Sequence, residues 1–584
     1  MNLLLICTVI FFGPLVFLRH CKEAFSAPKN MLVFFVLAVL FLLTAFKYFS
    51  GKLKISFQPA ILFLLFVILA FVSVFYSSNV MVSFRWALEM ALYLGLFMAV
   101  VNAASGNINV YFGILNVALF SGFLVAVIGI FQFFRLDLVF KVSNFTGRIS
   151  STLGNANFLA GYLILLVPVS MALFFVVEKP VFKVVYAINT FVLLAALFFT
   201  QTLNAWIGLA LGGLIFVILF VRYIPKYRKV VAVSALVLLT VVGALVFSFK
   251  PEEAIGKLNK FGQFETFAER GRWLMWRSAV EMIKERPLTG FGAGTFRLHF
   301  TGVEAKLLRT PEFEGYNHLI TKDAHNDYLQ IASELGIPGV LLLLTFIVTV
   351  VFGAARVLPK ENIKMQIVNI GIICALIAFM VHMFFNFPFK LSPTASLFFV
   401  YLGLMASTHS IKETTGPYSQ LRPVLFSVCL LVFLVAIPLE SCIFWSNYKL
   451  GRGIEAGAAK QYGEALTQAQ DSLIFSDIAG NTVDLRTHFY LGETNYHMRD
   501  FLSAENEFKK EVALNPFYPD ASYNLALIQE MNGKEEEALS NFRRALSMDD
   551  KFEGVPEKIE RLTKIVEKVN KVSKGDKEST KYKK

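Results

Sequence analysis

The chain has 584 residues, 56% of them hydrophobic, and a mean hydropathy of +0.60. These values exclude an ordinary soluble domain, because repeated apolar runs near ~20 residues are typical of membrane-spanning helices. The formal net charge is +13. In a membrane protein this excess is typical of cytoplasmic loops and anionic lipid surfaces, so we expect membrane lipids and no nucleic acid as partners.

The apolar runs predict an all-α, polytopic transmembrane bundle of about 12–13 spans. The first run has no basic segment before it and no obvious cleavage site, so we interpret it as a retained span. The candidate spans are residues 2–18, 31–46, 59–77, 86–101, 110–134, 157–177, 182–199, 205–221, 230–248, 336–354, 366–386, 394–407 and 422–445.

Changes in composition divide the chain into five parts. Residues 1–248 form an N-terminal bundle of about nine spans, and residues 249–335 form a large polar loop. Residues 336–445 carry the last spans. Residues 446–573 are charged and soluble, and the basic tail 574–584 is expected to be disordered.

Lysine and arginine in the loops predict the orientation. The loops 47–58, 222–229 and 355–365 are rich in these cations and fall on one side if the spans alternate. The positive-inside rule makes that side cytoplasmic. The large loop and the C-terminal domain are then extracytoplasmic, although the basic segment 19–30 argues the other way.

The soluble part contains an internal repeat. Leu491 matches Leu525, Ala504 matches Ala538 and Phe508 matches Phe542, each at an offset of 34 residues. This period resembles the tetratricopeptide helix pair. A single pair cannot bury its apolar face alone, so we predict a stacked α-solenoid. A degenerate unit precedes it, and an arbitrary helical-hairpin domain is the alternative.

Polar residues beside a membrane bundle are costly and therefore indicate function. The first group lies in TGRISSTLGNANFLAGYL, residues 146–163. Arg148 suits phosphate because a guanidinium donates two parallel hydrogen bonds to oxygen, and an anchor for lipid head groups explains it equally well. Asn155 is placed to cap the next helix, whose first turn contains Asn157.

The second group lies in ERGRWLMWRSAVEMIKERPLTGFGAGTF, residues 269–296. The pattern predicts a helix over 271–285, ended by a proline and followed by a tight glycine-rich turn. A solvated helix face explains Arg277 as well as a functional role does. Arg270 and Arg272 lie closer to the helix start, and the aromatic anchors Trp273 and Trp276, one and four positions after Arg272, favour anion binding at this position.

The third group lies in KDAHNDYLQIASELGIPG, residues 322–339. Helical spacing predicts that His325 begins one face of a short helix, which the sequence Gly-Ile-Pro-Gly then breaks. A histidine can remove a proton from a hydroxyl near neutral pH. Taken alone, His325 fits a helix cap or a packed ring better than a base. No Ser-His-Asp order or metal-ligand spacing supports hydrolysis or a metal site.

Taken together, these residues resemble the O-antigen ligase and polymerase superfamily of bacterial integral membrane proteins. The first matching feature is Gly271-Arg-x3-Trp with the glycine-rich turn up to Phe296. The second is His325 followed by ten residues and Gly336, and the third is the Arg148 loop. The resemblance covers about residues 30–410, and members with a tetratricopeptide tail share this architecture.

The resemblance implies a glycosyltransferase of the bacterial inner membrane that needs no metal and no cofactor. It would transfer a glycan from undecaprenyl diphosphate, outside the cytoplasm, to a hydroxyl of a lipid, glycan or protein acceptor. Carried over, Arg272, Arg270 and Arg148 would bind the diphosphate. His325 would activate or position the acceptor. Fixed cations suit this reaction because the leaving diphosphate gains charge. The further residues that we expect to bind substrate are Asn155, Asn157, Asn326, Asp327 and Tyr328.

One position departs from the family. Many members have Ser-Arg-Gly before Ala-Trp, where this chain has Thr-Leu-Asn, so Leu203 occupies the arginine position. Either Arg148, Arg270 or Arg272 compensates, or the donor is bound differently, or activity is reduced.

Other activities stay open. A glycan polymerase would use a second lipid-linked glycan as its acceptor, and a protein O-glycosyltransferase would use a protein side chain. A non-catalytic membrane scaffold that recruits an envelope protein through its repeats is an alternative of another class. A transporter is a weaker alternative, because Glu89 is the only acidic residue that we place in the middle of a span.

Overall fold

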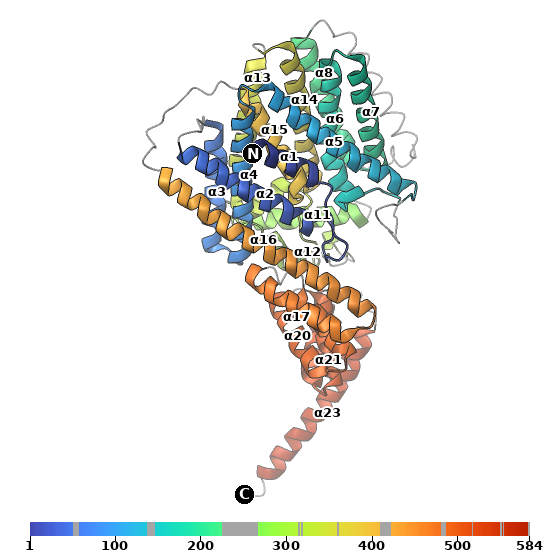
Figure 1. Cartoon of the computed structure of the whole chain (residues 1–584). Helices are drawn as coiled ribbons and strands as arrows, with labels where there is room; N and C mark the ends of the chain where they lie inside the picture. Colours follow the sequence, from blue (N-terminus) through green and yellow to red (C-terminus); the bar gives the residue numbers. More distant parts are fainter. Residues whose placement is uncertain are drawn as a thin grey trace. The chain divides into compact units, whose positions relative to one another are not determined.

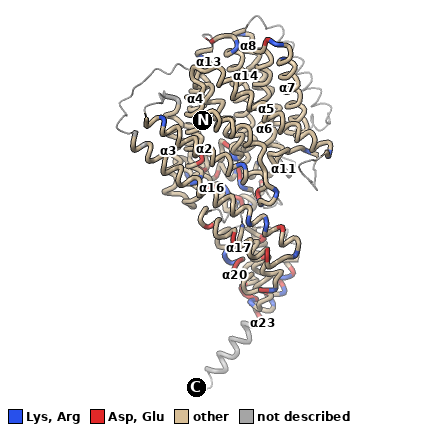
Figure 2. The backbone as a smooth tube through the Cα atoms, in the orientation of Figure 1, with Lys and Arg blue, Asp and Glu red and all other residues tan. Residues whose placement is uncertain are grey.

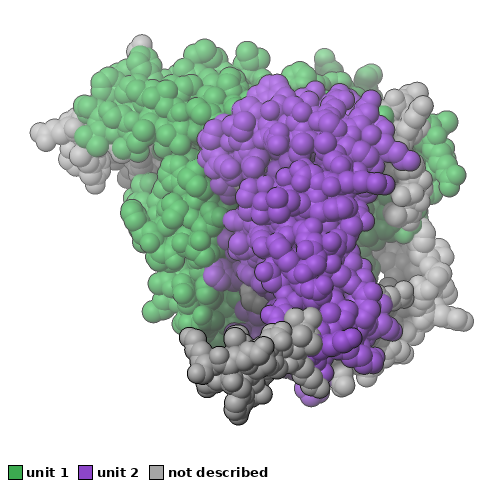
Figure 3. All heavy atoms as spheres, turned by 90° about the horizontal axis from the view of Figure 1, so that it is seen from below, with its two compact units in different colours: residues 1–19, 23–296, 323–441 green, residues 20–22, 297–322, 442–584 purple. Residues whose placement is uncertain are grey.

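The computed structural model describes residues 1–50, 58–136, 147–224, 267–313, 316, 319, 321–358, 361–408, 422–480, 486–516, 518–548, 552 and 554–581. Within these ranges the regular elements are all helical, and Figure 1 shows them in chain order. Figure 2 shows few charged residues on the N-terminal helices and many on the C-terminal ones. Figure 3 distinguishes two compact units: unit 1 has residues 1–19, 23–296 and 323–441, and unit 2 has residues 20–22, 297–322 and 442–584.

Unit 1 is a bundle of apolar helices. Nine helices of the described chain are long and apolar enough to cross a membrane, and three shorter apolar helices accompany them. The predicted all-α, polytopic membrane fold is therefore confirmed. The predicted span 230–248 and the loop residues 249–266 lie outside the described residues. The helices with residues in this unit are α1 (Asn2–Phe12), α2 (Ala27–Phe49), α3 (Gln58–Ser73), α4 (Val80–Ala104), α5 (Ile108–Phe133), α6 (Ala156–Val176), α7 (Pro180–Phe199), α8 (Leu203–Tyr223), α11 (Phe267–Glu285), α13 (Asp327–Val357), α14 (Ile363–Phe385), α15 (Ser392–Ser407) and the first part of α16 (Arg422–Ala458).

The first helix is shorter than the predicted span 2–18. Helix α1 has 11 residues and ends at Phe12, so at about 1.5 Å per residue it extends only about 17 Å, against a hydrocarbon core of about 30 Å. Pro14 accounts for the early end, because it lacks the N–H that would continue the helix. The predicted bounds are therefore wrong at this helix, and the predicted orientation of the bundle stays a prediction.

Helices α8 and α14 pack closely and run antiparallel. A Cβ atom on Gly208 would lie 2.5 Å from the carbonyl oxygen of Ala378, and one on Gly212 would lie 2.6 Å from that of Cys374. Small residues four positions apart allow two membrane helices to approach backbone to backbone. The antiparallel packing brings the start of α8 and the end of α14 to the same end of the bundle.

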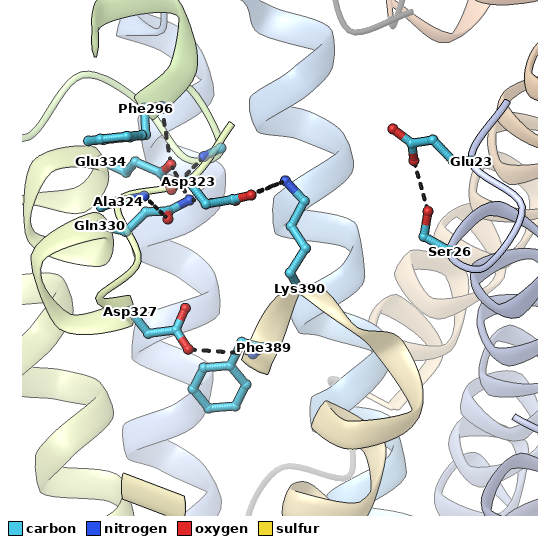
Figure 4. A network of polar contacts seen from close by, with 11 residues as sticks. Glu23, Ser26, Phe296, Asp323, Ala324, Asp327, Gln330, Glu334, Phe389 and Lys390 are labelled. Carbon is cyan, nitrogen blue, oxygen red and sulfur yellow. Dashed lines mark hydrogen bonds and ion pairs between the residues drawn. The ribbon is translucent and has the colours of Figure 1, made fainter. Parts of the chain in front are cut away.

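The glycine-rich turn after α11 is fastened to the first turns of α13. The Glu334 carboxylate accepts a hydrogen bond from the N–H of Gly294 at 2.8 Å. It accepts another from the N–H of Phe296 at 3.1 Å (Figure 4). The N–H of Gly292 donates to the Glu334 carbonyl oxygen at 2.9 Å. The turn needs glycine because Gly292 and Gly294 have φ angles of 108° and 73°. The predicted tight turn is therefore confirmed, and its partner is a buried glutamate.

Replacing Gly336 by alanine is expected to destabilise the contact between the segment after α11 and the first turns of α13. Gly336 interrupts α13 with φ 71° and ψ 177°, and the next N–H, that of Ile337, donates to the Pro287 carbonyl at 2.8 Å. Only glycine adopts these angles readily, and forcing another residue into them costs about 1–3 kcal/mol. A Cβ atom would also lie 2.5 Å from the Leu288 backbone. Thermal unfolding in detergent measures the loss. Gly213→Ala is the control, because its Cβ would meet nothing within 4 Å, and an equal effect of both changes would contradict the prediction.

Unit 2 stacks helix pairs as predicted. Each helix of the series from α17 to α23 contacts the next one described. The residues that repeat at an offset of 34 positions are all buried, namely Leu491 and Leu525, Ala504 and Ala538, and Phe508 and Phe542. The helices are α17 (Tyr462–Ala479), α19 (Thr487–His497), α20 (Phe501–Leu514), α21 (Pro519–Met531), α22 (Glu535–Met548) and α23 (Val555–Lys581), and most of α12 (Phe296–Leu307) also belongs to this unit.

The C-terminal end differs from its prediction. Helix α23 continues to Lys581, so most of the tail 574–584, for which the composition predicts disorder, is helical, and residues 582–584 lie outside the described residues. Lysine and glutamate are good helix formers, which explains why a charged segment extends an existing helix. The predicted domain boundaries at residues 248, 335 and 445 stay predictions.

Candidate functional site

The side chain of Arg148 lies at the end of the bundle where α6 and α8 begin. Its Nε donates to the carbonyl oxygen of Thr200 at 2.8 Å. Its Nη2 donates to Asn157 Oδ1 at 2.9 Å and to Thr202 Oγ1 at 3.1 Å. These three oxygen atoms are uncharged, so these bonds hold Arg148 in place without neutralising its charge.

The two asparagines of α6 have different roles. Asn155 caps the helix as predicted, because its Oδ1 accepts from the N–H of Asn157 at 2.8 Å. The side chain of Asn157 holds Arg148, and its carbonyl oxygen lies 3.1 Å from His382 Nε2. Contact of either asparagine with a substrate stays a prediction.

His325 lies just before α13, in a left-handed backbone conformation with φ 52°. The prediction that it begins the helix is wrong. Asn326 is the N-cap and accepts from two N–H groups of the first turn at 3.0 Å, so α13 begins at Asp327. The His325 ring meets the edge of Phe387, with centroids 4.4 Å apart. Its Nδ1 atom is buried and has no hydrogen-bond partner among the described residues.

The electrostatic environment of His325 keeps it neutral at physiological pH. Burial lowers the pKa of the imidazole to about 4, with Arg272 also lowering it and Asp323 raising it. The Asp323 carboxylate accepts from Lys390 Nζ at 2.8 Å (Figure 4). A neutral imidazole can accept a proton, whereas an imidazolium cannot.

The charge of Arg272 affects the pKa values of both Arg148 and His325. Burial lowers the pKa of the Arg148 guanidinium below its usual value, and the charge of Arg272 lowers it further. Arg272 also lowers the pKa of His325, so it lies near both groups. We call these three residues the arginine–histidine cluster. Segments distant in sequence bring it together: the loop before α6, the first turns of α11 and the residue two positions before α13.

Helix α11 is anchored beside the cluster by an aromatic contact. The Trp276 ring lies 5.5 Å from the Phe384 ring at the end of α14. Farther along the helix, Arg277 Nη1 lies 3.6 Å from Glu281 Oε1 in an ion pair. Arg270 lies in the first turn of α11, and its role in diphosphate binding stays a prediction.

The polar residues that open α13 fasten the helix to its neighbours. Asp327 accepts from the N–H of Phe389 at 3.4 Å (Figure 4), and the hydroxyl of Tyr328 donates to the Met380 carbonyl at 2.9 Å. Asn326 uses its oxygen as the cap, while its Nδ2 is buried without a partner among the described residues. These contacts explain the residues structurally, and their contact with a substrate stays a prediction.

Part of the chain is similar to known proteins. Residues 188–344, which include Arg272, Glu334 and the glycine-rich turn, match the O-Antigen ligase family. This match covers residues 188–344 of the 584 and makes that part of the chain similar to the O-antigen ligase family. A Rickettsia conorii protein named "Putative polysaccharide ligase" is 26% identical over 152 residues, which are 25% of this chain and 34% of that protein. The chain thus spans about a third of the length of that relative. The Cut9–Hcn1 hetero-tetramer of the APC/C matches at 10% identity with a TM-score of 0.20, over 92% of this chain and 83% of that chain, and carries no inference.

Sequence reasoning missed two buried residues that lie beside the candidate site. Glu334 is 1% exposed and holds the glycine-rich turn, and His382 is 0% exposed and contacts Asn157. The available signal was an ionisable residue within an apolar run, which is costly and therefore informative. Within the described part of the chain, no group of three or more His, Cys, Asp or Glu side chains is placed to hold a metal ion.

Proposed function

We propose that this chain transfers a glycan from undecaprenyl diphosphate to an acceptor hydroxyl on the outer side of the bacterial inner membrane. Arg148 and Arg272 bind the diphosphate. His325 removes the proton of the acceptor hydroxyl or orients that hydroxyl. The acceptor belongs to a lipid, a growing glycan or a protein.

The observation that supports this proposal best is the pairing of like charges. Arg148 and Arg272 lie near enough for one charge to lower the pKa of the other, and the hydrogen bonds of Arg148 go to uncharged oxygen atoms. An anion bound between two guanidinium groups offsets their mutual repulsion. A diphosphate offers such an anion, and the planar guanidinium fits its oxygen atoms with paired hydrogen bonds.

The chemistry needs only these groups and the two substrates. The acceptor oxygen attacks the anomeric carbon of the donor glycan and forms a new glycosidic bond. The bond from that carbon to the diphosphate oxygen breaks, and its electron pair leaves with undecaprenyl diphosphate. The acceptor proton passes to the imidazole of His325 and then to solvent. The arginines stabilise the charge that grows on the leaving diphosphate.

The placement of cations supports an extracytoplasmic site. Helices α8 and α13 begin at or next to the cluster and have Arg222 and Arg356 in their last turns. Helix α14 ends at the cluster, and Lys364 near its start pairs with Glu178 at 2.9 Å. The end of the bundle opposite the cluster therefore carries the cations that the positive-inside rule assigns to the cytoplasm.

The position of Arg148 suggests which residue replaces the arginine that many family members have where this chain has Leu203. Arg148 bonds to Thr200 and Thr202, the latter directly before Leu203. Its guanidinium therefore lies at the start of α8, next to the position of the family's arginine. We propose that Arg148 takes over that role in diphosphate binding.

A transfer assay with the purified full chain tests the function. The protein in detergent receives an undecaprenyl-diphosphate-linked glycan and one of three acceptors: a lipopolysaccharide core lipid, a second lipid-linked glycan or a serine-containing polypeptide. We expect product with one class, which distinguishes a ligase from a polymerase and from a protein glycosyltransferase. Absence of product with all three, from a folded sample, would overturn the enzyme proposal in favour of a scaffold.

A further inference from the structure

His382 is a buried histidine near the end of α14 that the proposed reaction does not use directly. It is 0% exposed, and its Nε2 lies 3.1 Å from the carbonyl oxygen of Asn157. A carbonyl oxygen only accepts hydrogen bonds, so Nε2 carries the hydrogen and Nδ1 is the acceptor. Nδ1 lies 3.5 Å from the Nδ2 atom of Asn386, which follows the last residue of α14.

These contacts connect the surroundings of Arg148 with the surroundings of His325. On one side, Asn157 receives the His382 hydrogen bond on its carbonyl and holds Arg148 with its side chain. On the other side, Asn386 is followed by Phe387, whose ring lies against the His325 ring. The end of α14 therefore contacts a neighbour of Arg148 and a neighbour of His325 at once.

A glycine on α6 makes room for this contact. Gly161 lies one turn after Asn157, and a Cβ atom at this position would lie 3.0 Å from His382 Nε2. Residues four positions apart share one helix face, so Asn157 and Gly161 both face the imidazole. A methyl group on residue 161 pushes the ring without removing any hydrogen-bonding group.

We propose that His382 is a positioning residue, which fixes Asn157 and through it the guanidinium of Arg148 in the orientation that binds a lipid diphosphate. The inference rests on the proposed function, because it assigns Arg148 to the diphosphate. Without the imidazole N–H, the hydrogen bond that ties Asn157, in the first turn of α6, to the end of α14 is lost, and Asn157 is no longer fixed from that side. Arg148 then keeps its charge but loses its fixed direction.

The experiment measures the Kd for undecaprenyl diphosphate, from the ligand-dependent rise in thermal unfolding temperature of the full chain. His382→Leu is expected to weaken binding by about tenfold, because it removes the hydrogen bond that fixes Asn157 beside Arg148. Adding His382→Leu to Arg148→Ala is expected to weaken binding by no more than about twofold further, since the two residues act through one contact. His382→Gln offers an amide N–H and is expected to retain most of the affinity.

Two further variants separate positioning from folding. Gly161→Ala is expected to weaken binding in the same direction as His382→Leu. Asn369→Leu is the matched control: this α14 residue is equally buried and bonded to Tyr111 at 2.6 Å, but it lies 13 residues away. At about 1.5 Å per residue that is about 20 Å along the helix. We expect it to lower stability and leave Kd unchanged.

The outcomes distinguish this inference from the proposed function. If Arg148→Ala leaves Kd unchanged, the diphosphate assignment fails and the inference fails with it. If Arg148→Ala weakens binding but His382→Leu does not, or if their effects add fully, only the inference is overturned. If His382→Leu does not fold, Gly161→Ala and His382→Gln decide: unchanged binding in Gly161→Ala overturns the inference, and weakened binding in that variant with retained binding in His382→Gln supports it.

Discussion

Replacing Arg148 or Arg272 by alanine is expected to lower kcat/KM for glycan transfer by about a hundredfold or more for each residue. Each guanidinium stabilises charge that grows on the leaving diphosphate, so its loss raises the barrier of the chemical step itself. Arg148→Lys keeps the charge but not the paired donors, and it is expected to recover only part of the activity. Initial rates at subsaturating lipid-linked glycan measure these effects.

The controls come from the same segments of the chain. Arg277→Ala removes an arginine of α11 that pairs with Glu281 at 3.6 Å, and activity within about twofold of wild type is expected for such a partly exposed pair. Leu203→Arg is a gain-of-function test in the Arg148→Ala background. Because Leu203 follows Thr202, a side chain that contacts Arg148, an arginine there should restore part of the lost rate. Wild-type activity in both single alanine variants would remove the arginines from the mechanism.

The sequence predicted the parts of this protein that depend on local pattern. Apolar runs located the spans, because a membrane requires long uninterrupted hydrophobic segments. Matches such as Phe508 with Phe542 located the repeats, because stacked units bury the same positions. Prediction of α1 went wrong where Pro14 limited a run that hydropathy alone would extend.

The sequence could not predict contacts between distant segments. His382 lies in an apolar run with no polar neighbour nearer than Asn386, so its partner Asn157, 225 positions away, leaves no local trace. Glu334 lies near the first turns of a span. Its hydrogen bonds from the N–H groups of Gly294 and Phe296 explain why an acidic residue stands there and why it faces a glycine-rich turn. Local pattern marked Arg272 and His325 as candidates, and the resemblance to a family implied their roles. Their proximity to Arg148 required the fold.

Replacing His325 is expected to separate turnover from stability. General-base catalysis contributes about 10²–10⁴-fold, so His325→Ala and His325→Gly should both lose activity on that scale. A glycine substitution ordinarily destabilises a protein more than an alanine substitution at the same position, and here we expect the reverse. His325 has φ 52°, a conformation that costs a non-glycine residue about 1–2 kcal/mol and glycine almost nothing. We therefore expect the glycine variant to unfold at a higher temperature than the alanine variant while both are inactive.

The pH dependence decides whether His325 removes the proton or only orients the acceptor. Burial, with the charge of Arg272, lowers the pKa of the free imidazole to about 4. A base must be neutral to act, so kcat/KM, which reports the free enzyme, should stay flat on acidification until the pH approaches about 4. The bound diphosphate adds negative charge and favours the imidazolium. The pKa that governs kcat should therefore rise towards the ordinary value near 6.5.

A single charge change checks the sign of this argument. Asp323 raises the pKa of His325, so Asp323→Asn should move the acid limb of kcat to lower pH, because the imidazolium loses a nearby anion. An orienting histidine gives a different result: kcat would show no acid limb that responds to Asp323→Asn, and His325→Asn, which keeps a hydrogen-bonding side chain without a titrating ring, would retain activity. If the acid limb of kcat moves to higher pH in Asp323→Asn, neither role of His325, as the base or as the group that orients the acceptor, is supported.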